Sequence, residues 1–329
     1  MSAAHPRDEW LRAVSAWWGR WFGRCAVRVR DGVASEPVPE APAGVPTRGV
    51  EGTLLPGLRD AHVHCGLVDL RTVRAGGIST ADDLGSPADV LSRLRDDPAA
   101  PRLRFAGAFL TAPGGYPSDR AWALPGSFRE VGSAADARVA VREQRRIGAS
   151  FIKIALHSGA GPLLPESVVD TIVTTAHDAG LPVVAHAEGE GTFGMAMRHG
   201  VDRLAHTPWT EQLPDRVLAE AAESMVWIST LDIHGHGADT EARRTAIANL
   251  RTFAGYGGTV RYGTDLGNGP LPLGVNTREV AALLAAGLSP DEVLASMTDR
   301  EAPPCWVAGG LDLDPGRFPG SLSTARVLG

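Results

Sequence analysis

The amino-acid sequence predicts an α/β protein built as a (β/α)8, or TIM, barrel. From Leu54 onward, eight short apolar runs of β type alternate with amphipathic segments. The runs are almost continuously apolar, which is typical of parallel strands that are covered on both faces. A length of 329 residues is enough for one such barrel, which commonly needs about 250 residues plus insertions.

The predicted strands occupy residues 58–64, 78–83, 102–110, 151–155, 183–187, 203–206, 226–230 and 260–264. Predicted helices lie between them at 134–147, 166–179, 215–224, 241–254 and 277–286. Gly148 and Gly180 stand where two of these helices should end. A doubly wound open sheet is the main alternative fold. No GxGxxG motif follows the first strand, which disfavours a nucleotide-binding version of that fold.

The residues outside the barrel differ in composition. Residues 34–47 hold four prolines and predict an extended connector. Before it, Trp10, Val14, Trp17 and Trp21 are spaced by 4, 3 and 4 residues, which predicts a helix whose tryptophans pack on the barrel or on a second subunit. Strands near 25–30 and 49–54 predict a reduced β-sandwich or an irregular flank. We therefore expect an N-terminal flank at 1–53, a barrel at 54–300 and a C-terminal tail at 301–329 that packs with the flank.

The composition excludes several classes of protein. The hydrophobic fraction of 43% and charged fraction of 21% are those of a globular chain. With 38 acidic and 32 basic residues and a net charge of −6, there is no basic surplus for nucleic acid. Three scattered cysteines, no signal peptide and no apolar stretch of membrane length predict a cytoplasmic protein without a membrane partner. A small-molecule substrate is expected, and a homo-oligomer is compatible with the sequence.

His62 and His64 end the first predicted strand and give the strongest local signal. Alternate side chains of a strand share a face, so both imidazoles should point into the barrel mouth. Further polar groups end later apolar runs: Lys153, His186, His206 and Asp265. Barrel enzymes keep their active sites at the carboxyl ends of the strands, so these six side chains should converge there. Burying them together without a partner would be costly, and metal coordination would offset the cost.

Lys153 is the only lysine in the chain, and the other 31 of the 32 basic residues are arginine. A sequence that otherwise uses arginine throughout has kept one primary amine. Guanidinium and ammonium are not interchangeable, because the ammonium group loses its proton far more readily. The sequence therefore indicates that position 153 needs an amine.

The set His62/His64, Lys153, His186, His206 and Asp265, in that order, resembles the two-metal branch of the amidohydrolase superfamily. The surrounding motifs are most similar to its imidazolonepropionase-like and prolidase-like members. They are Leu55-Pro56-Gly57, Gly77-Ile78-Ser79-Thr80, Asp83-Leu84-Gly85, Ala112-Pro113-Gly114-Gly115 and Ala187-Glu188-Gly189. The resemblance covers about residues 50–300 and is specific through the combination of motifs. The usual C-terminal Gly-x-x-Ala-Asp-Leu-Val segment of the family is missing here.

The resemblance implies two divalent metal ions, with Zn²⁺ as the expected metal, bridged by Lys153 after its carboxylation by CO₂. The first ion would be held by His62, His64, Lys153 and Asp265, and the second by Lys153, His186 and His206. Two metals about 3.5–4 Å apart can share a water and lower its pKa toward 7, which supplies hydroxide as the nucleophile. Asp265 would be the catalytic residue that accepts the proton and passes it to the leaving nitrogen.

This centre predicts hydrolysis of a peptide, N-acyl or cyclic amide bond. Cleavage of a lactone or ester and a non-hydrolytic cyclase or isomerase reaction are the alternatives. A mononuclear deaminase is disfavoured, because the position three residues after His186 is Gly189 rather than glutamate. The candidates for substrate contact are Tyr116 in the loop after the third strand, His157, and the pair His234 and His236.

Overall fold

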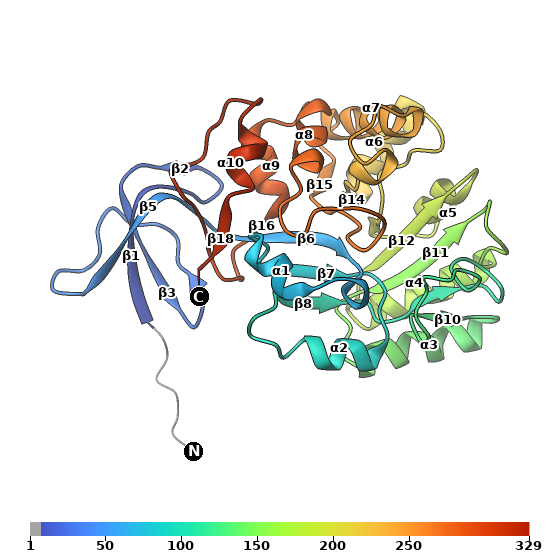
Figure 1. Cartoon of the computed structure of the whole chain (residues 1–329). Helices are drawn as coiled ribbons and strands as arrows, with labels where there is room; N and C mark the ends of the chain where they lie inside the picture. Colours follow the sequence, from blue (N-terminus) through green and yellow to red (C-terminus); the bar gives the residue numbers. More distant parts are fainter. Residues whose placement is uncertain (1–7, 329) are drawn as a thin grey trace, which may run out of the picture.

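The computed structural model describes residues 8–328. Figure 1 shows an α/β body with a separate sheet at one side, to which both ends of the chain contribute. Residues 1–7 and 329 of the predicted flank and tail lie outside the described residues. Among the helices of 8–328, none has the length and hydrophobicity needed to cross a membrane.

The α/β body contains two sheets of parallel strands. The smaller one consists of β6 (Gly57–Val63), β7 (Thr80–Asp83) and β8 (Arg102–Phe105), with the short antiparallel β16 (Thr298–Asp299) beside β6. The larger one has the order β10-β9-β11-β12-β13-β14-β15. Its strands are β9 (Phe109–Thr111), β10 (Phe128–Glu130), β11 (Ile152–His157), β12 (Val183–Glu188), β13 (Arg203–Leu204), β14 (Val226–Ile228) and β15 (Thr259–Arg261).

Backbone hydrogen bonds join the edges of the two sheets. The amide of Ala61 donates to the Tyr262 carbonyl at 3.0 Å, and that of His64 donates to Leu266 at 2.8 Å. At the other edge, the Ser150 amide donates to Phe105 at 2.8 Å. The predicted α/β class with parallel strands is therefore confirmed, but the strands form two ladders rather than the single closed ladder of the prediction.

The predicted third strand, 102–110, is divided into β8 and β9. Gly107 lies between them with a φ of 77°, a left-handed conformation that interrupts extended backbone. The next amide, of Ala108, donates to the side chain of Gln144 at 3.1 Å instead of to a neighbouring strand. Register therefore breaks at this glycine, which explains why a continuous apolar run does not give a continuous strand.

Helices cover the parallel strands: α1 (Leu70–Ala75), α2 (Ala88–Leu94), α3 (Ala134–Arg146), α4 (Glu166–Asp178), α5 (Thr192–Arg198), α6 (Asp215–Ser224), α7 (Glu241–Gly255), α8 (Thr277–Ala285), α9 (Pro290–Met297) and α10 (Phe318–Leu322). Ser133 caps the start of α3 by accepting from the Asp136 amide, and Ser289 forms a capping box with Glu292 at α9. Gly148 and Gly180 follow α3 and α4 with positive φ angles, as their sequence positions predict.

The predicted N-terminal helix is wrong, because its residues form a strand. The terminal sheet has the order β18-β17-β5-β1-β3-β4, and β2 also pairs with β1. Its strands are β1 (Asp8–Trp17), β2 (Trp21–Phe22), β3 (Cys25–Arg30), β4 (Val33–Ala34), β5 (Thr47–Leu55), β17 (Cys305–Val307) and β18 (Ala325–Val327). A regular seven-stranded sheet also decides against an irregular flank.

Pairing on both edges explains why β1 is extended. It lies between β3, which is antiparallel to it, and β5, which is parallel to it, so strand pairing satisfies its backbone on two sides. From Leu11 to Val14, buried and exposed residues alternate with the period of a strand. The tryptophan spacing matches a helix, but this alternation and the long-range pairing outweigh it.

The tryptophans of the flank contact the α/β body rather than solvent alone. The indole nitrogens of Trp17 and Trp21 both donate to Oδ1 of Asp291, at 2.9 Å each. Asp291 belongs to the first turn of α9, where a negative charge is favourable. One carboxylate therefore joins the terminal sheet to the helix behind β15.

Candidate metal centre

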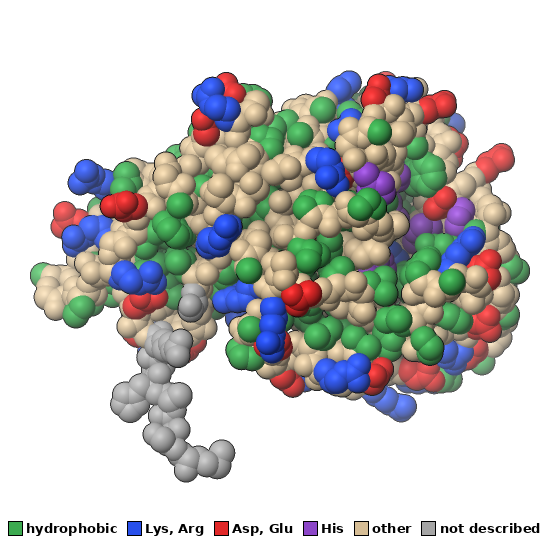
Figure 2. Space-filling model, viewed as in Figure 1, with side chains coloured by type: hydrophobic (Ala, Val, Ile, Leu, Met, Phe, Trp, Pro, Cys, Tyr) green, Lys and Arg blue, Asp and Glu red, His purple; other side chains and the backbone are tan. Residues whose placement is uncertain are grey.

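The six predicted metal ligands line one cavity of about 460 Å³. They are His62, His64, Lys153, His186, His206 and Asp265. Each is at most 8% exposed. Lys153 is the second residue of β11 and not, as predicted, at the end of its strand. On the face drawn in Figure 2, histidine side chains gather where the surface is hollowed. The structure therefore brings together side chains that are separated by more than 200 residues in the sequence.

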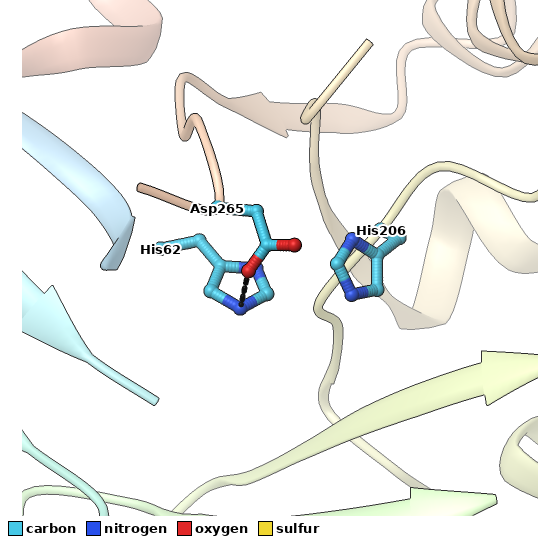
Figure 3. Close-up of side chains that lie close together, drawn as sticks. All are labelled: His62, His206 and Asp265. Carbon is cyan, nitrogen blue, oxygen red and sulfur yellow. Dashed lines mark ion pairs between the residues drawn. The ribbon is translucent and has the colours of Figure 1, made fainter. Parts of the chain in front are cut away.

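Asp265 lies close to the two histidines of the His-x-His motif. Its Oδ1 is 2.9 Å from Nε2 of His62 and 3.0 Å from Nε2 of His64. Figure 3 shows that carboxylate beside His62, with the ring of His206 across from it. The Asp265 backbone has a φ of 58°, a left-handed conformation that non-glycine residues adopt rarely and that is commonly found at functional sites.

Asp60 fixes the two strand ends that carry these groups. Its buried carboxylate accepts hydrogen bonds from the amides of His62 and Thr264, both at 3.0 Å, and from the Thr264 hydroxyl at 2.5 Å. Burial raises the pKa of Asp60 to about 7. Thr264, the residue before Asp265, is thus hydrogen-bonded to Asp60, two positions before His62, which holds both halves of the site in register.

Protein oxygens hold one ring nitrogen of three histidines. Nδ1 of His62 is 2.9 Å from the Ala205 carbonyl, and Nδ1 of His206 is 3.0 Å from the Thr230 hydroxyl. Nδ1 of His64 is 3.4 Å from the Gly85 carbonyl. Partners of this kind fix the orientation of a metal-binding imidazole and leave its other nitrogen, here Nε2, available to the cavity.

Lys153 is 1% exposed, and its Nζ has no hydrogen-bond partner among residues 8–328. The same is true of three neighbouring atoms, Nε2 of His62, Nε2 of His186 and Oδ1 of Asp265. The His62 and Asp265 atoms are 2.9 Å apart but lack the angles of a hydrogen bond. Buried polar atoms normally have hydrogen-bond partners, so this group of nitrogen and oxygen atoms without them is suited to coordinate a cation.

The pKa values of these groups favour the protonation states that bind metal. Burial lowers the pKa of Lys153 to about 7 and that of His62 to about 4. It also holds the pKa of His206 well below its usual value. For Asp265, burial acts to raise the pKa, but the opposite effect of His62 and His64 is larger. The pKa of Asp265 therefore lies well below its usual value. At His64 burial acts to lower the pKa, but Asp265 raises it above its usual value. The cavity therefore presents neutral imidazoles at His62 and His206 and an ionised carboxylate at Asp265, which are ligands for divalent cations.

A second group of close donors lies in the same cavity. Glu188 is 3.1 Å from Nε2 of His186 and 3.3 Å from Nε2 of His157. The three could share one cation. Sequence reasoning missed the proximity of Glu188, although it follows His186 by two positions in β12 and so lies on the same face of the strand. This spacing of two residues could have predicted that Glu188 lies beside His186.

Two of the four predicted substrate contacts line the cavity, and a third lies beside it. Tyr116 and His234 line it, and the Tyr116 ring stacks on His186 with centroids 4.9 Å apart. His157 is next to this pair, 5.2 Å from the Tyr116 ring. His236 is not among the lining residues; its ring packs against Gly269. Trp122, in the loop 111–125 that the sequence predicts as a lid or pocket wall, also lines the cavity. Further lining residues that the sequence did not indicate are Leu67, Phe109, Glu188, Trp209, Ile233, Ala242, Gly267, Asn268 and Gly269.

Comparison of the sequence with protein-family models gives no match. Among curated proteins, an uncharacterized protein of Mycobacterium tuberculosis is 29% identical over 307 residues, covering 84% of this chain and 78% of its own length. An uncharacterized protein of Mycobacterium bovis matches to the same extent.

Solved structures resemble the whole chain in fold. Ochratoxinase of A. niger superposes with a TM-score of 0.79 at 16% identity, covering 98% of this chain and 94% of its own. A Xaa-Pro dipeptidase with bound methionine gives 0.78 at 19% identity and 97% of both chains. A structure described as an amidohydrolase gives 0.76 at 21% identity, with 96% and 94% covered. This chain has the amidohydrolase fold.

The fold shared with these solved structures extends over both parts of the molecule. Coverage of 96% or more includes the terminal sheet as well as the α/β body. The flank that the sequence left undecided is therefore shared with these solved structures.

Proposed function

We propose that the protein is a metal-dependent hydrolase of the amidohydrolase superfamily that cleaves an amide bond of a small molecule. The observation that carries the proposal is the buried, unpartnered amine of Lys153 among four histidines and Asp265 in one cavity. Structures of the same fold include a Xaa-Pro dipeptidase, a prolidase complex and molinate hydrolase, which supports hydrolysis. We also infer that the two parallel sheets work as one (β/α)8 barrel, since hydrogen bonds join their edges.

The proposed centre holds two divalent ions, with Zn²⁺ as the expected metal. His62, His64 and Asp265 would hold the first, and His186 and His206 the second. Lys153 would bind both after its amine adds to carbon dioxide, which forms an N–C bond and releases one proton. The unpartnered nitrogen and oxygen atoms of this set support the assignment.

When bound, such ions lower the pKa of water and polarise a scissile carbonyl. Asp265 would take the proton of the attacking water and deliver it to the leaving nitrogen. Its geometry suits that role: Asn268 donates to Oδ2 at 2.8 Å, while Oδ1 faces His62 and His64. Asn268 thus fixes one oxygen of the carboxylate, and the other faces the proposed metal ligands His62 and His64.

The remaining cavity wall would bind the substrate. Tyr116 and His234 line it, His157 lies beside Tyr116, and these three are proposed contacts. His236 packs on Gly269 and would support the 267–269 loop instead. A volume of about 460 Å³ is within the usual range for small-molecule sites, about 300–1,000 Å³.

The proposal is tested by metal analysis and intact-mass measurement of protein purified without chelator. The expected result is two divalent ions per chain and an added mass of one carbon dioxide, which Lys153→Arg should abolish if Lys153, the only lysine, carries it. Well under one ion per chain contradicts the proposal.

The type of reaction is tested separately in water enriched in heavy oxygen. An amide panel should give products that contain solvent oxygen. Turnover of esters or lactones alone would move the assignment to that alternative. Product formation without solvent oxygen would indicate a cyclase or isomerase.

A further inference from the structure

Glu188 is a charged group at the cavity wall that the proposed hydrolytic chemistry does not use. It ends β12, two residues beyond His186 and on the same face. Its side chain is 20% exposed and lines the cavity, with one oxygen toward His186 and the other toward His157. A carboxylate that is partly desolvated and faces a ligand site interacts strongly with a cation that enters it.

Aromatic rings surround the same part of the cavity. Tyr116 lies 4.9 Å from the His186 ring and 6.1 Å from Trp122, between ring centroids. Trp209 adds a further wall beside His234, at 4.8 Å. The guanidinium of Arg120 lies 5.6 Å from the centroid of Tyr116, so this ring already attracts a cation at its edge of the cavity. Carboxylates combined with aromatic faces are the usual recognition elements for organic ammonium groups.

We propose that the substrate carries a positively charged amine, which Glu188 and the rings of Tyr116, Trp122 and Trp209 bind beside the metal centre. This inference rests on the proposed function only in taking the cavity as the substrate site. It narrows the substrate class from amides in general to cationic amides.

The charges of the described lining residues agree with this choice. They include one lysine, Lys153, which the metal centre would use, and Glu188 as the acidic group outside that centre. Arg120 is 3.3 Å from Asp119, which compensates its charge. An ammonium group near Glu188 would therefore gain an ion pair without displacing a resident lysine or arginine of the wall.

A purely structural role for Glu188 makes a different prediction. If its carboxylate only orients His186 and His157, its loss changes the binding of charged and uncharged ligands alike. If it binds the substrate amine, its loss weakens cation binding selectively. The ratio of two affinities separates these cases.

The test uses the metal-loaded, full-length protein and two inert ligands of the same shape, phenethylammonium and 2-phenylethanol. Binding is followed by the change in intrinsic tryptophan fluorescence, since two of the eight tryptophans, Trp122 and Trp209, line the cavity. We expect phenethylammonium to bind about tenfold more tightly than 2-phenylethanol. In Glu188→Gln, which keeps the shape and removes the charge, the two affinities should become equal within a factor of about two.

Glu190→Gln is the matched control. It makes the same charge change two residues further along, at an exposed position that does not line the cavity, and it should keep the wild-type ratio. Metal content is measured for each protein, so that a disturbed His186 is recognised. Equal binding of both ligands by the wild-type protein overturns the inference, as does a ratio that Glu188→Gln leaves unchanged. Preference for the ammonium ligand in a protein that hydrolyses no amide would overturn the proposed function and leave this inference standing.

Discussion

The carboxylate of Asp265 has two oxygens with different surroundings. Asn268 donates to Oδ2, and Oδ1 lies 2.9 Å from His62 and 3.0 Å from His64. The left-handed backbone at this residue keeps the side chain directed at the histidines. A group held this way can carry a proton without moving its main chain, which is the property that general acid–base catalysis needs.

Asp265→Asn keeps the shape of the side chain and removes its basicity. We expect turnover to fall by about 10²–10⁴-fold, because the amide cannot accept the proton of the attacking water. The folded state should persist, as judged by circular dichroism. Rates are measured on an amide that the wild-type protein hydrolyses, with Asn268→Ala as a control that keeps the carboxylate. Near-normal turnover in Asp265→Asn would remove this residue from the proton transfer.

Lys153 offers a test of whether the amine itself is needed. Lys153→Arg keeps a positive charge of similar length, but guanidinium does not take up carbon dioxide. We expect bound metal to fall below half of the wild-type content, and the added mass of carbon dioxide to disappear. The measurement is elemental analysis with intact-mass spectrometry. Full metal content in Lys153→Arg would mean that the four histidines and Asp265 suffice.

At the scale of elements, apolar patterning predicted most strands and five helices of the α/β body within a few residues, but not α1, α2, α5, α9 or β10. The observed α6 spans the predicted 215–224, and β12 begins at the predicted residue 183. These elements could be predicted because each buries one contiguous apolar face. The terminal flank could not, because β1 owes its extended form to β3 and β5, which are distant partners in the sequence.

The contact between the flank and α9 depends on one side chain. Trp17 is 3% exposed, and both its indole and that of Trp21 donate to Asp291. Asp291→Ala should lower the free energy of unfolding by about 1–3 kcal/mol, because it leaves the buried Trp17 donor unsatisfied. Asp291→Asn keeps an acceptor oxygen and should cost less than half as much. Chemical denaturation measures both variants. An equal loss in the two would point to the charge at the start of α9 instead of the hydrogen bonds.

At the scale of the molecule, five of the six candidate ligands could be predicted as a set because they end apolar runs, whereas Lys153 lies second in β11 and the run continues after it. Parallel strands bring such ends to one face, so sequence position stood in for spatial position. The positions of Glu188, Trp122 and Trp209 in the cavity could not be predicted from sequence position. Their place in the cavity depends on how the loops and strand ends turn inward, and a local pattern does not encode that.

The same arrangement predicts where metal binding stabilises the protein. The ligands belong to β6, β11 and β12 and to the segments after β13 and β15, whereas the terminal sheet has its own apolar core, which includes Leu11, Val27 and Leu54. Ions bound only to the folded state stabilise it by about 2.7 kcal/mol when their concentration is 100 times Kd. Removing them should therefore lower Tm by several degrees, since about 1 kcal/mol corresponds to roughly 2 °C in a chain of this size.

Hydrogen exchange then locates that loss. After treatment with a chelator, amides near the ligands should exchange faster, while those of β1, β3 and β5 should exchange at their former rates. The cause is that removing the ions takes away the bonds that hold these side chains together, so the strand ends that carry them open locally more often. Adding Zn²⁺ back to the wild-type protein should restore the protection. Adding it to the Asp265→Asn variant should restore the protection only in part. Faster exchange spread evenly over the terminal sheet and the α/β body would mean that the ions stabilise the fold as a whole. Unchanged exchange everywhere would mean that the cavity binds no metal.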